Sequence, residues 1–180
     1  DATFEFAMAP NRDVFAIKKS GTASKTTEVH VLSASSGYQQ FALQTDTALH
    51  ETDGTWEFAL APNRDLFAFK KRGTGSNSTE VHILSAASGS KQFSLHTGTA
   101  LHETDATFEF GVAPNRDVFA IKKSGTGSGS TEVHVLSAAS GYQQFSLQTA
   151  TALHETDHTF EFAVAPNRDV FAIKKSATGS

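Results

Sequence analysis

The residues of this chain that could do chemistry come in tandem copies. The tetrapeptide His-Glu-Thr-Asp occurs at 50–53, 102–105 and 154–157. A hydrolase or a carboxylate pair needs one constellation whose surroundings push its groups into different roles, which copies do not favour. A zinc-protease helix would need a second histidine three residues after the glutamate, and that position is Gly54. The sequence therefore predicts no catalytic residues, no metal site and no cofactor.

Two interpretations of this tetrapeptide stay open, and both follow from its place at the handover between copies. It could be a polar turn in which Thr and Asp bond backbone amides. Alternatively, its His and Asp could point into a cleft between neighbouring units and bind sugar hydroxyls. The candidates for the second interpretation are His50, His102, His154, Asp53, Asp105 and Asp157.

Arginines and tyrosines in turns add further candidates for a sugar site. Arg64 and Arg116 stand in repeated Ala-Pro-Asn-Arg-Asp turns, where they could contact a ligand or simply solvate the turn. Tyr38 and Tyr142 follow a glycine in a loop and could form a platform on which a sugar ring stacks. The middle copy has Ser90 at this place, so a tyrosine platform would leave that copy weak or silent.

Other conspicuous side chains have structural explanations. Trp56 is the only tryptophan and replaces a repeated phenylalanine, which favours packing. His30, His82 and His134 alternate with apolar residues in one run of each copy, which favours a hydrogen-bonded structural histidine.

Composition excludes several classes of protein. The chain has 180 residues, a formal net charge of -4 and no cysteine, so nothing favours nucleic acid, an anionic membrane, disulfides or a zinc–thiolate site. No apolar run approaches the roughly 18–20 residues that span a bilayer, so we expect no membrane insertion. The chain opens on Asp1 without a basic-then-apolar leader, so a signal peptide was either removed or never there.

The copies define the organisation of the chain. The period is 52 residues, giving repeats 1–52, 53–104 and 105–156 and a partial repeat 157–180 within a single array 1–180. The first and third copies differ at eight of 52 positions. Periods of about this size indicate solenoids, propellers or arrays.

Each repeat contains four runs that predict strands. In the first copy these are 3–9, where apolar residues alternate, the apolar run 14–17, the alternating run 28–32, and 40–49. Pro10 to Asp13 predict a tight turn, and 21–26 predict a hairpin loop. No stretch has a capped 3.6-residue apolar stripe, so we predict no helix.

Four antiparallel strands in about 50 residues match one blade of a β-propeller. The predicted fold is therefore all-β, a propeller of four-stranded antiparallel blades. The chain holds about three and a half blades, and two chains supply 360 residues, close to seven units of 52. We expect a seven-bladed ring completed by a second copy, a homodimer, unless the chain is a piece of a longer protein.

The runs T-x-E-F-A-V-A, D-V-F-A-I-K-K-S-G-T-G and T-E-V-H-V-L-S resemble the FG-GAP/VCBS-type repeats of integrin-like β-propellers. They are most similar to Psathyrella velutina-type fungal lectins and to propeller modules of secreted fungal and bacterial hydrolases. The resemblance implies a calcium loop between the first two strands. Here that joint is the short Ala-Pro-Asn-Arg-Asp turn with few oxygen ligands, so we expect the calcium sites to be lost.

Repetition and resemblance together suggest a function. Linked weak sites gain avidity by ~10²–10⁴ on a repetitive target such as a cell-surface or cell-wall glycan. The sequence thus predicts a secreted, non-catalytic, multivalent lectin with sugar sites between adjacent blades. The alternatives are a structural or wall-targeting module of a larger secreted protein, and an engineered consensus repeat. A cytoplasmic location stays open because no leader is visible.

Overall fold

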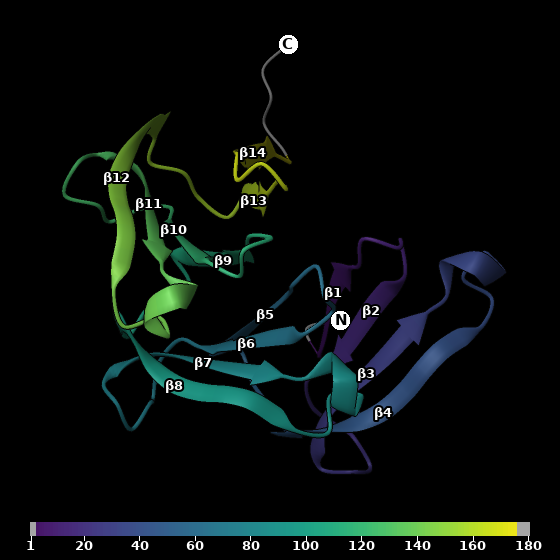
Figure 1. The fold of residues 1–180 in the computed structure, drawn as a ribbon. Coiled ribbons are helices and arrows are strands. Elements are labelled where there is room, and N and C mark those ends of the chain that lie inside the picture. Colours follow the sequence, from purple (N-terminus) through teal and green to yellow (C-terminus); the bar gives the residue numbers. More distant parts are fainter. Residues whose placement is uncertain (1–2, 176–180) are drawn as a thin grey trace. The chain divides into compact units, whose positions relative to one another are not determined.

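The computed structural model describes residues 3–175, and these residues form antiparallel sheets joined by tight turns (Figure 1). Each full repeat folds into one four-stranded sheet whose neighbouring strands follow each other in the chain. The predicted all-β class and the four antiparallel strands per repeat are confirmed. The ends of the predicted array, 1–2 and 176–180, lie outside the described residues.

The strand boundaries repeat with the sequence. The first sheet contains β1 (Phe4–Met8), β2 (Val14–Lys18), β3 (Thr26–Leu32) and β4 (Phe41–His50). The second contains β5 (Trp56–Leu60), β6 (Leu66–Lys70), β7 (Ser78–Leu84) and β8 (Phe93–His102). The third contains β9 (Phe108–Val112), β10 (Val118–Lys122), β11 (Ser130–Leu136) and β12 (Phe145–His154). The partial repeat forms a two-stranded sheet of β13 (Phe160–Val164) and β14 (Val170–Lys174).

The prediction of no helix is wrong at one place in each full repeat. A single 3₁₀ turn follows the third strand, at Ala34–Ser36, Ala86–Ser88 and Ala138–Ser140. Each turn ends at a glycine in the left-handed region, with φ of 62°, a conformation that glycine adopts without steric cost. A three-residue turn is too short to carry a helical apolar period, so no sequence pattern indicated it.

A turn aspartate anchors each of these 3₁₀ turns. In the first copy the backbone N–H of Ala34 donates to Asp13 Oδ1 over 2.9 Å, and the Asn11 side-chain amide donates to Asp13 Oδ2 over 2.7 Å. The carboxylates of Asp65 and Asp117 accept the equivalent backbone bonds. The Pro-Asn-Arg-Asp turn is thus closed by Asn and Asp side chains, as its composition predicts.

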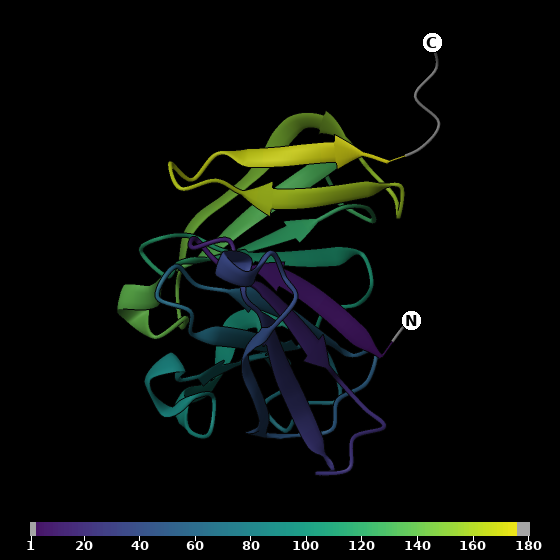
Figure 2. The ribbon, with the colours of Figure 1, turned by 90° about the vertical axis from the view of Figure 1, so that its right-hand side faces the viewer.

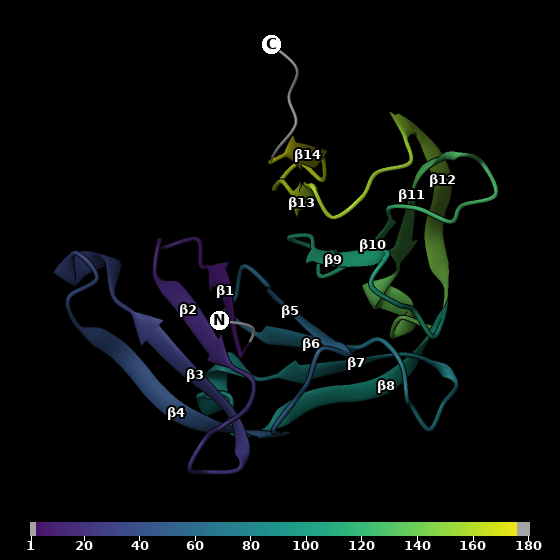
Figure 3. The ribbon, with the colours of Figure 1, turned by 180° about the vertical axis from the view of Figure 1, so that it is seen from behind.

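The described chain divides into two compact units. The first contains the residues up to Lys71 together with Glu80–Thr97, and the second contains Arg72–Thr79 together with the residues from Gly98 onward. In the first unit, β1–β4 and β5–β8 are neighbouring sheets (Figure 3). Their shared core includes Phe15, Ile17, Val31, Phe58 and Leu66.

The second unit repeats this packing between the third sheet and the terminal hairpin. The hairpin β13–β14 lies beside the sheet of β9–β12 (Figure 2). Buried Phe119, Ile121 and Val135 form the core there, with Phe162 and Val164 of β13 packed against it. In both units, therefore, the apolar face of one repeat is covered by the first strands of the next.

Two sheet faces keep their apolar residues in solvent. Phe6 is 65% exposed, whereas Phe58, its equivalent in the second repeat, is 6% exposed. Phe171 of β14 is 56% exposed, whereas Phe119 is 4% exposed. The sequence around these phenylalanines is nearly the same, so the difference comes from the presence or absence of a covering sheet.

Candidate functional site

Three residues of the His-Glu-Thr-Asp motif bond to the chain itself. Glu51 Oε1 accepts the Thr22 backbone N–H over 2.7 Å and the Thr22 hydroxyl over 3.0 Å. Buried Thr52 lies against Thr27, with 3.3 Å between their hydroxyl oxygens. Glu155 and Thr156 make the same contacts in the third repeat. The motif therefore fixes the loop between the second and third strands of a repeat to the segment that connects this repeat to the next.

The motif aspartates Asp53, Asp105 and Asp157 each close a local turn. Asp53 Oδ1 accepts the Thr55 backbone N–H over 2.8 Å and the Thr55 hydroxyl over 2.5 Å. These bonds stabilise the carboxylate and lower the pKa of Asp53 below its usual range. Hydrogen bonds from Thr159 lower the pKa of Asp157 in the same way. One oxygen of each carboxylate is thus already engaged.

The motif histidines His50, His102 and His154 are exposed. His50 lines a cavity in the first unit together with Glu51 and Trp56. The motif glutamates and aspartates are exposed as well, but their carboxylates already accept bonds from the chain, so the histidine is the motif side chain most open to a ligand.

Two turn arginines, Arg64 and Arg168, contact the preceding sheet. Arg64 has a positive φ of 69°, and its guanidinium lies over the ring of Phe15, 5.3 Å from the centroid. Its Nη2 is 3.5 Å from Asp13 Oδ2. In the second unit Arg168 repeats both contacts, at 5.6 Å from the Phe119 ring and 3.1 Å from Asp117 Oδ2. We call this arrangement the arginine clamp.

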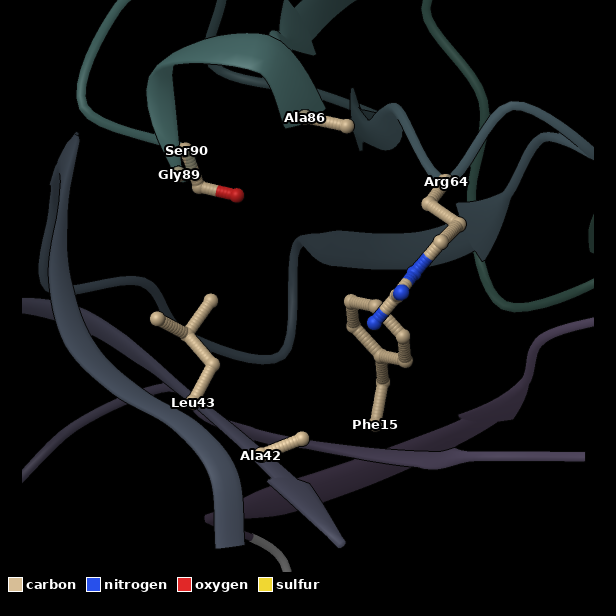
Figure 4. Close-up of a pocket in the computed structure, with 7 residues that line it drawn as sticks. All are labelled: Phe15, Ala42, Leu43, Arg64, Ala86, Gly89 and Ser90. Carbon is tan, nitrogen blue, oxygen red and sulfur yellow. The ribbon is translucent and has the colours of Figure 1, made fainter. Parts of the chain in front are cut away.

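The clamp of Arg64 forms one wall of a pocket in the first unit (Figure 4). Phe15, Ala42 and Leu43 give an apolar floor. Ala86, Gly89 and Ser90 of the next sheet line the opposite side, with the Ser90 hydroxyl directed inward (Figure 4). The cavity is about 340 Å³, within the ~300–1,000 Å³ of small-ligand sites. An apolar floor beside a fixed cation and a hydroxyl suits a small polar ligand with one apolar face.

The loop tyrosines differ in accessibility. Tyr38 is exposed and Tyr142 is buried. Their hydroxyls donate to the backbone carbonyls of Arg12 and Arg116, over 3.3 and 3.2 Å. Each tyrosine ring therefore reaches toward the turn arginine of its own sheet. In the second repeat this position is Ser90, whose side chain is too short to fill the space that a tyrosine ring occupies. The pocket beside Arg64 lies in this space.

A second cavity of the first unit, about 350 Å³, is lined by aromatic and imidazole rings. The Trp56 ring meets the His82 ring edge-on at 4.9 Å, and the rings of His82 and His96 stack at 3.8 Å. Burial, together with the nearby His96, lowers the pKa of His82 to about 4, so this ring is neutral at neutral pH. His96 and Glu80 complete this side of the cavity.

The second unit carries a cavity of about 440 Å³ that is more polar. Asp105, Phe108 and Lys122 line it together with Arg72. Asp105 is therefore at a surface hollow, although its carboxylate also bonds Thr107.

The structure thus separates the predicted site residues instead of bringing them into one pocket. Arg64, His50 and Asp105 each line a different cavity. Glu80 and His96 were not predicted as site residues, because 80, 82 and 96 match no motif spacing. The available signal was the difference between copies, since His96 stands where the other repeats have Gln44 and Gln148.

Two comparisons with known proteins gave no match. No protein-family model matches the chain, and no curated protein sequence matches it. No helix among the described residues is long and apolar enough to cross a membrane.

Proposed function

We propose that this protein is a multivalent, non-catalytic carbohydrate-binding protein whose sugar sites lie between adjacent sheets. The observation that carries the proposal is the pocket beside Arg64 (Figure 4). Sugars present an apolar C–H face and a rim of hydroxyls, and the pocket offers an apolar floor with a guanidinium and a hydroxyl at its edge. A glycan ligand implies action at a cell surface or wall, outside the cell.

Preorganisation supports this assignment. The ion pair with Asp13 and the contact with Phe15 hold the Arg64 guanidinium in place before any ligand arrives. A planar guanidinium carries five N–H donors in a fixed fork, so it can bond a hydroxyl while it keeps its ion pair. Less side-chain freedom is then lost on binding.

In this proposal multivalency comes from the pairing of two chains. Within one chain Arg168 repeats the arginine part of the site with Phe119 and Asp117, whereas the complete pocket is the one beside Arg64 and Ser90. A single weak site gains avidity when its copies meet a repetitive glycan.

In this proposal the sheets are blades of a propeller. The exposed Phe6 and Phe171 faces are apolar surfaces that equivalent residues bury elsewhere. A ring of seven blades built from two chains would cover both faces.

The test exchanges the loop residues between copies. Wild-type protein is first screened on a glycan array, and the best monosaccharide is then titrated by calorimetry. Ser90→Tyr introduces the residue of the other copies at a position whose positive φ, 65°, is the same as that of Tyr38. We expect this variant to fold, to fill the pocket and to lose one sugar site per chain.

The reciprocal variant Tyr38→Ser separates this pocket from a tyrosine platform. We expect it to bind the monosaccharide as the wild type does. If Tyr38→Ser abolishes binding while Ser90→Tyr has no effect, the platform is the site and the pocket assignment fails. Absence of any glycan binding by the wild type would instead favour the structural or wall-targeting module.

A further inference from the structure

The second repeat differs from its neighbours around one buried histidine. In the first and third repeats, the side-chain amide nitrogens of Gln44 and Gln148 lie 3.2 Å from Nδ1 of His30 and His134. An amide nitrogen can only donate, so it fixes the imidazole proton on Nε2. In the second repeat His96 replaces the glutamine, and among the described residues His82 Nδ1 has no hydrogen-bond partner.

Because of this replacement, no amide donor determines which ring nitrogen of His82 carries the proton. Without the amide donor, the ring can carry its proton on Nδ1 and present the lone pair of Nε2. That nitrogen is the one that faces a carboxylate, since Nε2 lies 3.2 Å from Glu80 Oε2. A neutral imidazole nitrogen beside a carboxylate oxygen is a pair of metal ligands.

His96 supplies a third ligand to the same point. Its Nε2 lies 3.7 Å from Glu80 Oε2, and one ligand atom from each of Glu80, His82 and His96 lies within 4.8 Å of the others. In a tetrahedral zinc site with bonds of ~2.0–2.1 Å, neighbouring ligand atoms are about 3.3 Å apart. The two distances to Glu80 Oε2 are close to that spacing. The His96 ring stacks on that of His82 at 3.8 Å and is exposed, so metal binding requires that it turn out of this stack to direct Nε2 at the same point.

We propose that Glu80, His82 and His96 form a binding site for a first-row divalent transition metal such as Zn²⁺, Ni²⁺ or Cu²⁺. Two imidazoles and one carboxylate suit these ions better than Ca²⁺ or Mg²⁺, which take oxygen ligands. Solvent completes the coordination through the cavity lined by Trp56 and Phe93. Lys70 is the pairing partner of Glu80 on the neighbouring strand, and the negative charge of Glu80 offsets that cation. The site lies in the second repeat, because among residues 3–175 two histidines gather around one glutamate only there.

The sole tryptophan reports on this site directly. The Trp56 ring is 4.9 Å from the His82 ring, so a paramagnetic ion bound to His82 should quench its fluorescence. We expect Cu²⁺ to quench Trp56 in a saturable manner, and Zn²⁺ to compete. Calorimetry with Zn²⁺ should give one site per chain. The sugar proposal plays no part in this measurement.

Two variants built from the repeats test the ligand set. His96→Gln restores the glutamine of the other copies, so it should fold and bind Zn²⁺ at least 10-fold more weakly, with little Cu²⁺ quenching. Gln148→His places a second histidine beside Glu132 and His134 in the third repeat, and it should raise the Zn²⁺ stoichiometry from one to two. His158→Gln removes an exposed histidine elsewhere and should change neither value.

Any of three results overturns the proposal. The first is no saturable Zn²⁺ binding below about 100 µM, which corresponds to a weak association. The second is unchanged binding by His96→Gln. The third is an equal loss in His158→Gln, which would indicate adventitious binding to surface histidines. Far-ultraviolet circular dichroism of each variant confirms that the sheets are retained.

Discussion

Glu5 and Glu109 occupy the same place in their repeats and meet the same partner in the next sheet. Glu5 Oε1 accepts the backbone N–H of Phe58 over 2.8 Å, and Glu109 Oε1 accepts that of Phe162 over 2.8 Å. Burial raises the pKa of both carboxyls, although the backbone bond and a neighbouring lysine act against it. A glutamate of the T-x-E-F run thus joins one sheet to the next at some electrostatic cost.

This cost predicts a pH dependence. Because the folded-state pKa of Glu109 is above its ordinary value of 4.5, the folded state holds the proton more tightly than the unfolded state. The contribution of this group to stability is full below pH 4.5 and is lost as the pH rises through the folded pKa. Glu109→Gln keeps the oxygen acceptor and has no charge to bury. We expect its free energy of unfolding, relative to wild type, to improve between pH 4 and pH 7.

Urea unfolding at both pH values measures this change. Glu161→Gln is the comparison variant: Glu161 has the same repeat position and is exposed, but its charge adds to the raised pKa of Glu109, so we expect the same change in a weaker form. If the advantage of Glu109→Gln over wild type in the free energy of unfolding falls toward pH 7, the expectation is wrong. The ion pair of Glu109 with Lys123, 3.5 Å away, would then outweigh the cost of burial.

At the scale of the elements, neighbouring sheets are joined by few polar contacts of fixed geometry. In the first unit the Ala48 N–H of β4 donates to the Ser90 carbonyl over 3.1 Å, and in the second the Ala100 N–H of β8 donates to the Tyr142 carbonyl over 2.9 Å. Within each unit the arginine clamp adds a charged contact at the turn of the following hairpin, through Arg64 in the first unit and Arg168 in the second. These contacts fix how one sheet meets the next, while apolar burial supplies most of the stabilisation.

The clamp can be tested on the terminal hairpin. Arg168→Ala removes the ion pair with Asp117 and the contact with the Phe119 ring. The Arg168 side chain is partly exposed in both contacts, so we expect a loss of about 1 kcal/mol in the free energy of unfolding. Hydrogen exchange should locate the loss in β13 and β14.

Arg12→Ala provides the control for this substitution. Arg12 stands at the same turn position of the first copy, and no clamp is formed by it within residues 3–175. Equal destabilisation by both variants would mean that the arginine acts within its own turn and not on the preceding sheet.

For the whole molecule, the two uncovered apolar faces decide how the chain behaves in solution. Met8 lies beside Phe6 on the first face, and Ile173 beside Phe171 on the other; all four are exposed. Contiguous apolar surface on a soluble protein indicates an interaction surface. Since the repeats bury the same positions against each other, a second copy presents the matching face.

We therefore predict self-association through these faces. Light scattering coupled to gel filtration should give twice the chain mass of 19.2 kDa. Met8→Glu and Phe171→Glu should each shift the protein toward the single-chain mass, because each buries a charge in the proposed contact. A wild-type mass of one chain would contradict the two-chain ring, and a series of larger masses would indicate open-ended stacking.

The sequence by itself determined the period, the four strands of each repeat and the closed Asn–Asp turns, because alternation and turn chemistry are local properties. It also identified Arg64 as a ligand candidate. It could not predict the 3₁₀ turns, which are too short for a period, or the cluster of Glu80 and His96, whose side chains meet only across paired strands.

Burial and pairing were decided by tertiary structure alone. The strands β2, β10 and β14 share the sequence Val-Phe-Ala-Ile-Lys, yet the first two are buried and the last is largely exposed. Ser90 and Tyr142 hold equivalent positions in their repeats. The pocket beside Arg64 is open where the small Ser90 side chain faces the preceding sheet. Local sequence encodes each sheet, whereas the environment of a residue depends on the neighbour that covers that sheet.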